Sequence, residues 1–215
     1  MRPVVVSVGP LASASANAIA LSQTPTKGAL TLNGALATGG VVTMDTPRQV
    51  LITTTGNETS RTFTITGTNA SNDPITEVIT GVNNSTVASV LTYNTVTSIV
   101  ISGNAANALT VGTNGIADSP WVRVDEWSEE VVAVQAIASG TVNYTVQYSL
   151  DDPNSPTNAV APSAMTWTNI ADLSLVAATG SAVAFTPFPP LWIKTTLNSG
   201  TGSVRTTFSQ PGGIQ

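Results

Sequence analysis

The sequence has few side chains suited to acid–base or nucleophilic catalysis. It contains no histidine and no cysteine, so it lacks the commonest general base and the thiolate nucleophile. Carboxylates occur as neighbouring pairs at Asp125-Glu126, Glu129-Glu130 and Asp151-Asp152. Neighbouring residues of a strand point to opposite faces, whereas a hydrolytic carboxylate pair must flank one cleft. We therefore expect a protein that is not an enzyme.

One loop offers oxygen ligands for a hard cation. Asp151, Asp152 and Asn154 lie within four residues of one another, and carboxylate and amide oxygens are typical calcium ligands. The same residues surround Pro153, which ends a strand because proline has no N–H for the ladder. A metal-free turn is the main interpretation and calcium the weaker one. No cofactor and no other metal site is predicted.

Tryptophan and arginine alternate with valine in the segment 121–127. In an extended strand, Val122 and Val124 share one face, while Trp121, Arg123, Asp125 and Trp127 share the other. Tryptophan and arginine are enriched at the energetic centres of protein interfaces. Three interpretations stay open for the tryptophans: core packing, a protein interface, or stacking on sugars. The interface candidates are Trp121, Arg123, Asp125, Trp127 and Trp192.

Charged residues are scarce along the whole chain. They make up 9% of its 215 residues, against about 25% in typical soluble domains. Threonine, serine, asparagine and alanine take their place, with 34 threonines in all. Interface cores are depleted in lysine, glutamate and aspartate. The composition therefore favours a surface that other protein molecules cover, and a homo-oligomer, with a trimer preferred. A secreted β-protein with a neutral surface is the alternative.

The distribution of charge and hydropathy excludes several partners. The net charge is −5, and the seven basic residues are scattered, so we expect no nucleic-acid binding. No apolar run approaches the roughly 18 residues of a membrane span. The start, Met1–Val6, is short and β-branched, unlike the apolar region of a signal peptide. We expect synthesis in the cytoplasm without export and no membrane association.

The hydropathy pattern predicts β-structure almost throughout. Short segments rich in valine, isoleucine and threonine recur between clusters of glycine, asparagine, proline and aspartate. In Thr141–Ser149, apolar residues alternate with polar ones, as in a half-buried antiparallel strand. Ser85–Tyr93 is interpreted as a turn of helix. The predicted strands are Gln49–Thr54, Arg61–Thr66, Ile75–Thr80, Val96–Ile101, Ala108–Val111, Val131–Ile137, Thr141–Ser149, Leu191–Leu197 and Ser203–Ser209.

A change in composition near residue 117 predicts two domains. The segment Gly112–Asp118 is rich in turn residues, and all four tryptophans follow it. We predict an all-β protein with an extended N-terminal arm over residues 1–27. Two antiparallel β-sandwich domains, jelly-roll or immunoglobulin-like, follow in tandem over residues 28–117 and 118–215. The arm is rich in small residues, and such segments often become ordered against a neighbouring molecule.

Several segments resemble structural proteins of tailed bacteriophages. In the first half these are Leu30–Gly34, Arg61–Thr68, Glu77–Gly81, Thr95–Ile99 and Val111–Gly115. In the second half they are Gly140–Tyr148, Asp151–Pro153 and Leu197–Val204. Together the segments span most of the chain. The resemblance implies a structural role in the virion and carries no catalytic residues.

The resemblance and the composition together lead to one expectation about function. The chain is expected to decorate or cement a phage capsid, with the major capsid protein and copies of itself as partners. Arg48, Arg61 and Lys194 are expected as charges at the rim of the interface. A tail, neck or head-fibre component is the first alternative. The second is a carbohydrate-binding module that uses exposed tryptophans.

Overall fold

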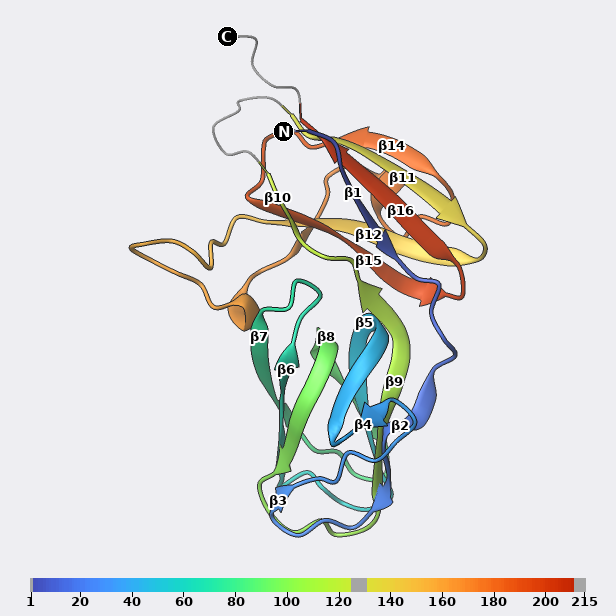
Figure 1. The fold of residues 1–215 in the computed structure, drawn as a ribbon, viewed down its shortest axis with the longest axis vertical. Coiled ribbons are helices and arrows are strands. Elements are labelled where there is room, and N and C mark those ends of the chain that lie inside the picture. The colour runs from blue at the N-terminus through green and yellow to red at the C-terminus, as the bar shows by residue number, and fades with distance from the viewer. Residues whose placement is uncertain (1, 125–130, 211–215) are drawn as a thin grey trace. The chain divides into compact units, whose positions relative to one another are not determined.

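The computed structural model describes residues 2–124 and 131–210, and this part of the chain is all β (Figure 1). Its helical segments are two single 3-10 turns, η1 (Pro162–Ala164) and η2 (Leu173–Leu175). No helix of the described part is long and apolar enough to cross a membrane. The chain forms two compact units: unit 1 comprises residues 1–11 and 116–215, and unit 2 comprises residues 12–115.

Unit 2 is built on one antiparallel sheet with the strand order β9-β5-β8-β6-β7. Three further strands pair at its margins: β2 with β9, β3 with β8, and β4 with β5. The last strand of this sheet, β9, continues into unit 1. The strands are β2 (Ser15–Gln23), β3 (Gly28–Ala29), β4 (Ala37–Thr38), β5 (Val41–Thr54), β6 (Thr62–Thr68), β7 (Pro74–Thr80), β8 (Thr86–Ile101) and β9 (Leu109–Asp118).

The sheet of unit 2 folds around a single apolar core. Buried residues from its middle and both ends, such as Ile52, Ile75 and Val111, belong to one cluster. Strand β2 lies close over β9 because Gly112 has no side chain, and a Cβ there would stand 1.9 Å from the Ser15 carbonyl oxygen. Glycine at this position therefore permits the two backbones to approach.

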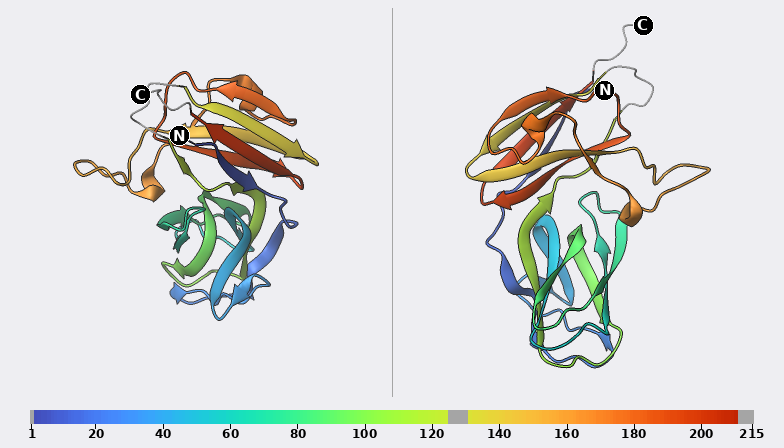
Figure 2. Two further views of the ribbon diagram at one scale, coloured as in Figure 1. Left: turned by 45° about the horizontal axis from the view of Figure 1, so that its top comes forward. Right: turned by 180° about the vertical axis from the view of Figure 1, so that it is seen from behind.

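Unit 1 is a β-sandwich. One sheet has the order β1-β16-β11-β14, and the other contains β13, β12, β15, β10 and the last residues of β9 (Figure 2). All pairings recorded between these strands are antiparallel. The strands are β1 (Val4–Val8), β10 (Val122–Arg123), β11 (Ala133–Ser139), β12 (Val142–Ser149), β13 (Thr168–Asn169), β14 (Ala182–Phe185), β15 (Trp192–Gly200) and β16 (Ser203–Ser209).

The core of unit 1 lies between its two sheets. Val134 and Phe208 come from one sheet and Tyr144 and Ile193 from the other, and all are buried in one cluster. This confirms the alternation predicted for the strand that contains Tyr144. A buried pair of threonines on β15 and β16, Thr195 and Thr206, adds a hydroxyl–hydroxyl hydrogen bond of 2.8 Å between the two sheets.

The all-β prediction is confirmed, and every predicted strand overlaps an observed one. The predicted helical turn at Ser85–Tyr93 is wrong, because Thr86–Ile101 form the long strand β8. This segment pairs with β5, where Leu51 faces Ala88. A bulge then inserts residues opposite Val50, and it breaks the period-two pattern that would have identified the strand.

The N-terminal residues differ from the predicted arm. Val4–Val8 form β1, which pairs with β16 in unit 1, and Ser15–Gln23 form β2, which pairs with β9. Residues 4–8 and 15–23 are thus part of the two sheet systems rather than of a free extension. The break between Gly115 and Ile116 lies two residues from the predicted boundary at residue 117.

A buried arginine holds together three segments of unit 2. The Arg48 side chain is 1% exposed, and its guanidinium pairs with both oxygens of the Asp45 carboxylate. It also donates to the carbonyl oxygens of Ala12, at 3.0 Å, and Asn114, at 3.4 Å. The expected role of Arg48 as a rim charge is therefore wrong, because the residue lies inside the fold.

We expect Arg48→Ala to lower the free energy of unfolding by about 3 kcal/mol, because it leaves a carboxylate and two carbonyl groups without their donor. Chemical denaturation measures this loss. Lys27→Ala removes an exposed charge and is the control, with an expected change within about 0.5 kcal/mol. Equal effects of the two substitutions would contradict the anchoring role of Arg48.

The side chain of Tyr93 lies in the core of unit 2. The hydroxyl of Tyr93 is buried and makes no hydrogen bond to the described residues. Burial, and then the charge of Glu77, raises the pKa of Tyr93 above its ordinary value of 10.0. Burial also raises the pKa of Tyr144, whose hydroxyl donates to the Gly180 carbonyl oxygen at 2.9 Å.

Tyr93→Phe is therefore expected to preserve the stability at pH 7 or increase it by up to about 1 kcal/mol. Because the pKa of Tyr93 is raised in the folded state, its contribution to the free energy of unfolding is fully present below pH 10. This contribution declines as the pH rises beyond 10. The variant should lose less stability than the wild type in that alkaline range. Tyr144→Phe is the matched control, and it should cost about 1 kcal/mol because it removes a hydrogen bond. Urea titrations from pH 7 to 11 test both.

Candidate functional site

Unit 1 brings together three of the five predicted interface residues. Trp121, Arg123 and Trp192 lie side by side, whereas Asp125 and Trp127 lie outside the described residues. Strand β10 pairs with β15 such that Val122 faces Ile193 and Arg123 faces Trp192. Because the first pair points into the core, the second lies on the outer face of the sheet.

The tryptophans form a compact group that we call the tryptophan cluster: Trp121, Trp167 and Trp192. The Trp121 ring lies 5.0 Å from that of Trp167 and 6.4 Å from that of Trp192, with tilted and edge-on geometries that aromatic pairs favour. All three side chains are half-buried. Of the three interpretations, core packing is wrong for these residues, because none of them belongs to the core cluster of unit 1.

Two cations lie against the rings of the tryptophan cluster. The Arg123 guanidinium stands 5.9 Å from the centre of the Trp192 ring, and the Lys194 ammonium stands 4.5 Å from that of Trp167. Cation–π contacts of this kind fix the orientation of a ring. Trp167 was not among the predicted interface residues, and Lys194 was expected only as a charge at the rim of the interface. The signal for Lys194 was its spacing of two from Trp192, which places both on one face of β15.

Lys194 is also one half of a buried ion pair. Its ammonium lies 2.6 Å from Oδ2 of Asp118, and both side chains are more than nine-tenths buried. The Thr196 hydroxyl donates to Oδ1 of the same carboxylate at 2.5 Å. The expected role of Lys194 as a rim charge is therefore wrong. A buried pair is retained only when both charges are compensated, and here the cation and the hydroxyl compensate Asp118.

A row of amide side chains continues the same outer face along β12, β13 and β15. We call it the amide strip: Asn143, Gln147, Asn169 and Asn198. The Gln147 amide donates to Asn169 at 3.0 Å, and Asn198 donates to Asn143 at 2.8 Å. Oε1 of Gln147 also lies 3.1 Å from Oγ1 of Thr196, the residue that contacts Asp118. The strip therefore connects with the Asp118–Lys194 pair. The face therefore combines aromatic rings with ordered neutral polar groups.

The loop that was considered for calcium uses its carboxylates for its own backbone. Asp151 accepts the N–H of Thr166 at 2.5 Å, and Asp152 accepts that of Asn154 at 2.9 Å. These contacts are those of a stabilised turn, the main interpretation from the sequence. Within residues 2–124 and 131–210, no three histidine, cysteine or acidic side chains gather as a metal site would require.

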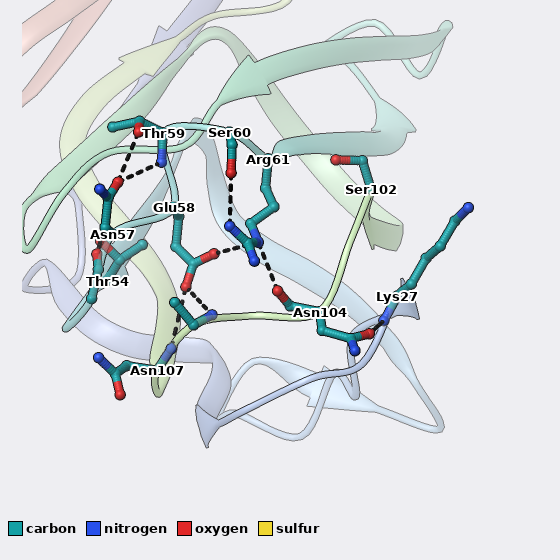
Figure 3. Close-up of polar contacts among 12 residues, drawn as sticks. Lys27, Thr54, Asn57, Glu58, Thr59, Ser60, Arg61, Ser102, Asn104 and Asn107 are labelled. Carbon is teal, nitrogen blue, oxygen red and sulfur yellow. Dashed lines mark hydrogen bonds and ion pairs between the residues drawn. The ribbon is translucent and has the colours of Figure 1, made fainter.

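A second polar cluster surrounds Glu58 in unit 2 (Figure 3). Its fully buried carboxylate accepts the N–H groups of Ala106 and Asn107, at 2.6 and 3.3 Å, and faces Arg61 at 3.3 Å. Arg61 in turn donates to the Asn104 carbonyl oxygen at 2.6 Å. The contacts with Asn104, Ala106 and Asn107 tie the loop after β8 to the turn before β6. The cluster is therefore a loop anchor, and its acid has no exposed surface for catalysis.

Comparison with protein-family models, with curated proteins and with solved structures found no match to this chain.

The Asp118–Lys194 pair can be tested by a double-mutant cycle. Asp118→Ala or Lys194→Met alone should lower the unfolding free energy by about 3 kcal/mol, because each leaves one charge buried without its partner. The double variant should lose clearly less than the sum, with a coupling of at least about 1 kcal/mol. Denaturant titrations measure all four proteins. Additive losses would show that the two charges do not support each other.

Proposed function

We propose that the chain is a non-enzymatic structural protein of a bacteriophage particle that decorates or cements the capsid. Its partners are the major capsid protein and copies of itself, and a trimer is the preferred assembly. The proposal rests on how the fold distributes apolar and charged side chains. The resemblance of several segments to tailed-phage structural proteins supports the same assignment.

The observation that carries the proposal is a nearly uncharged outer face on unit 1 that exposes apolar side chains. The sheet β1-β16-β11-β14 turns Val5, Ile137, Val183 and Phe185 away from the core, and the last two are each 59% exposed. Neutral polar residues lie between them, since Thr207 and Gln135 stand in register between Val5 and Val183. Arg205 is the one charged side chain on this face among the described residues of the four strands. Exposed apolar groups among neutral polar ones lose little on desolvation, so this face suits contact with another protein molecule.

Unit 2 presents a second uncharged face. Its outer surface over β6, β7 and β8 is made of side chains in register, such as Thr64 between Val78 and Val100. Neutral threonine-rich surface loses little on desolvation compared with charged surface, so contact with a partner costs little. The residues of this face are Thr62, Thr64, Thr66, Thr68, Thr76, Val78, Thr80, Thr95, Ser98 and Val100.

The fold makes the surface poorer in charge than the composition implies. Four of the few charged residues are buried: Arg48, Glu58, Asp118 and Lys194. Their charges serve internal anchoring and are not available to keep the surface hydrated. A protein that works as a free monomer usually carries a charged and mixed surface. The shortage of surface charge therefore favours permanent contact with other protein molecules.

The double variant Val183→Asp/Phe185→Asp is expected to abolish assembly, because two carboxylates would be desolvated in the contact. Light scattering and native mass spectrometry should show an oligomer for the wild type and a monomer for the variant. Thr24→Asp/Thr26→Asp, at exposed positions outside both faces, is the matched control and should assemble as the wild type does. A monomeric wild type, even at high protein concentration and with capsids present, would contradict the proposal.

The position on the particle is tested separately. Mass spectrometry of gradient-purified virions of the phage that encodes the chain should detect it, and cryo-electron microscopy should place it on the capsid surface. Density on the tail axis or in fibres would instead assign it to the tail, neck or head-fibre class. Absence of the protein from purified particles would overturn a virion role.

A further inference from the structure

We propose that the outer face of β12, β13 and β15 in unit 1 binds a neutral polysaccharide, with Trp167 stacking on one sugar ring and the amide strip binding the sugar hydroxyl groups. This goes beyond the structural role proposed above. It concerns the face of unit 1 opposite to that of β1-β16-β11-β14, because the two sheets of the sandwich present separate outer surfaces.

The first step concerns the aromatic group. Trp167 immediately precedes β13 and keeps part of its ring exposed. Lys194 at 4.5 Å and Trp121 at 5.0 Å hold the ring in place without any ligand. A side chain that is already ordered loses little conformational entropy on binding, so it is a good platform for a flat apolar ligand face. The rings of the cluster are tilted by 57° and 67° to one another, so they suit one sugar ring rather than a flat crystalline surface.

The second step concerns the polar groups beside this ring. Planar amides offer a donor and an acceptor in a fixed orientation, the arrangement that pairs with sugar hydroxyl groups. Asn169 uses its oxygen for Gln147, and within the described structure its exposed NH₂ group has no partner. Asn198 uses its NH₂ group for Asn143 and Thr145, and its oxygen has no partner there. Gln147 and Asn143 are four residues apart on β12, a distance of roughly 13 Å along the strand, which exceeds the size of one sugar ring.

The third step concerns charge. The buried ion pair of Asp118 and Lys194, at 2.6 Å, neutralises the charges beneath the face. The amide strip itself is uncharged, and so are its neighbours Thr145 and Thr168. Arg123, an exposed cation of the same face, lies against the ring of Trp192. A neutral ligand is therefore favoured over an anionic one. The fixed polar groups also distinguish this face from the centre of a protein interface, which is usually more apolar.

Affinity electrophoresis of the full chain tests the proposal. The gels contain dextran, galactomannan or mixed-linkage β-glucan as neutral probes, and alginate as the anionic comparison. At least one neutral polysaccharide should retard the wild type. Trp167→Ala should weaken this retardation at least tenfold, and Trp167→Phe should preserve it within about threefold, because phenylalanine keeps an aromatic face. Val90→Ala, an exposed apolar residue of unit 2 outside the proposed faces, is the matched control and should bind as the wild type does.

Asn169→Ala provides a second test that does not depend on the folding of Trp167→Ala. Asn169 is exposed, so its truncation should leave the fold intact while weakening retardation about three- to tenfold. Wild-type mobility unchanged by all three neutral probes, or retarded by alginate alone, would overturn the proposal. So would wild-type binding by both Trp167→Ala and Asn169→Ala. If Trp167→Ala instead dissociates an oligomer without any sugar binding by the wild type, the face is a protein interface. The structural role has separate readouts, so either proposal can fail alone.

Discussion

The requirement that a buried charge be compensated organises both units of this protein. Arg48 pairs with Asp45, and its remaining contacts tie Ala12 and Asn114 to the sheet of unit 2. Asp118 and Lys194 connect the end of β9 to β15 in unit 1. Ala12 and Asn114 lie near the two ends of unit 2, and Asp118 and Lys194 lie on different strands. An unpaired charge at any of these positions would cost several kcal/mol, so the pairs favour one arrangement of strands over others.

This internal use of charge has a consequence for the surface. A chain with so few ionisable residues that buries Arg48, Glu58, Asp118 and Lys194 leaves broad areas neutral. The neutral areas differ in kind. The β1-β16-β11-β14 face of unit 1 mixes exposed apolar side chains with neutral polar ones, the β6-β7-β8 face of unit 2 is rich in threonine, and the β12-β13-β15 face of unit 1 carries amides beside tryptophan. Apolar and threonine surfaces suit packing against protein, whereas an aromatic ring beside fixed amides suits a hydroxyl-rich ligand.

For the tryptophan cluster, the sequence pattern predicted correctly which side chains face outward, but it did not identify every residue of the cluster. The alternation over 121–124 correctly placed Val122 and Val124 toward the core and Trp121 and Arg123 away from it. The same rule does not identify Trp167, which immediately precedes β13. Trp167 reaches the cluster because β13 pairs with β12, the neighbour of β15. Sequence separation of more than 40 residues hides such a contact, since periodicity reports only the faces of one strand.

Local periodicity and turn residues predict the β-class, the position of most strands and the inward face of β12. The positions of the charges depend instead on contacts between distant parts of the chain. Arg48 and Lys194 look like surface residues in the sequence, but the distant partners Asp45, Ala12 and Asp118 make their burial possible. Likewise, residues 4–8 and 15–23 are strands only because β16 and β9 offer them edges. Pairing across the fold is a long-range property, and composition and local pattern contain no record of it.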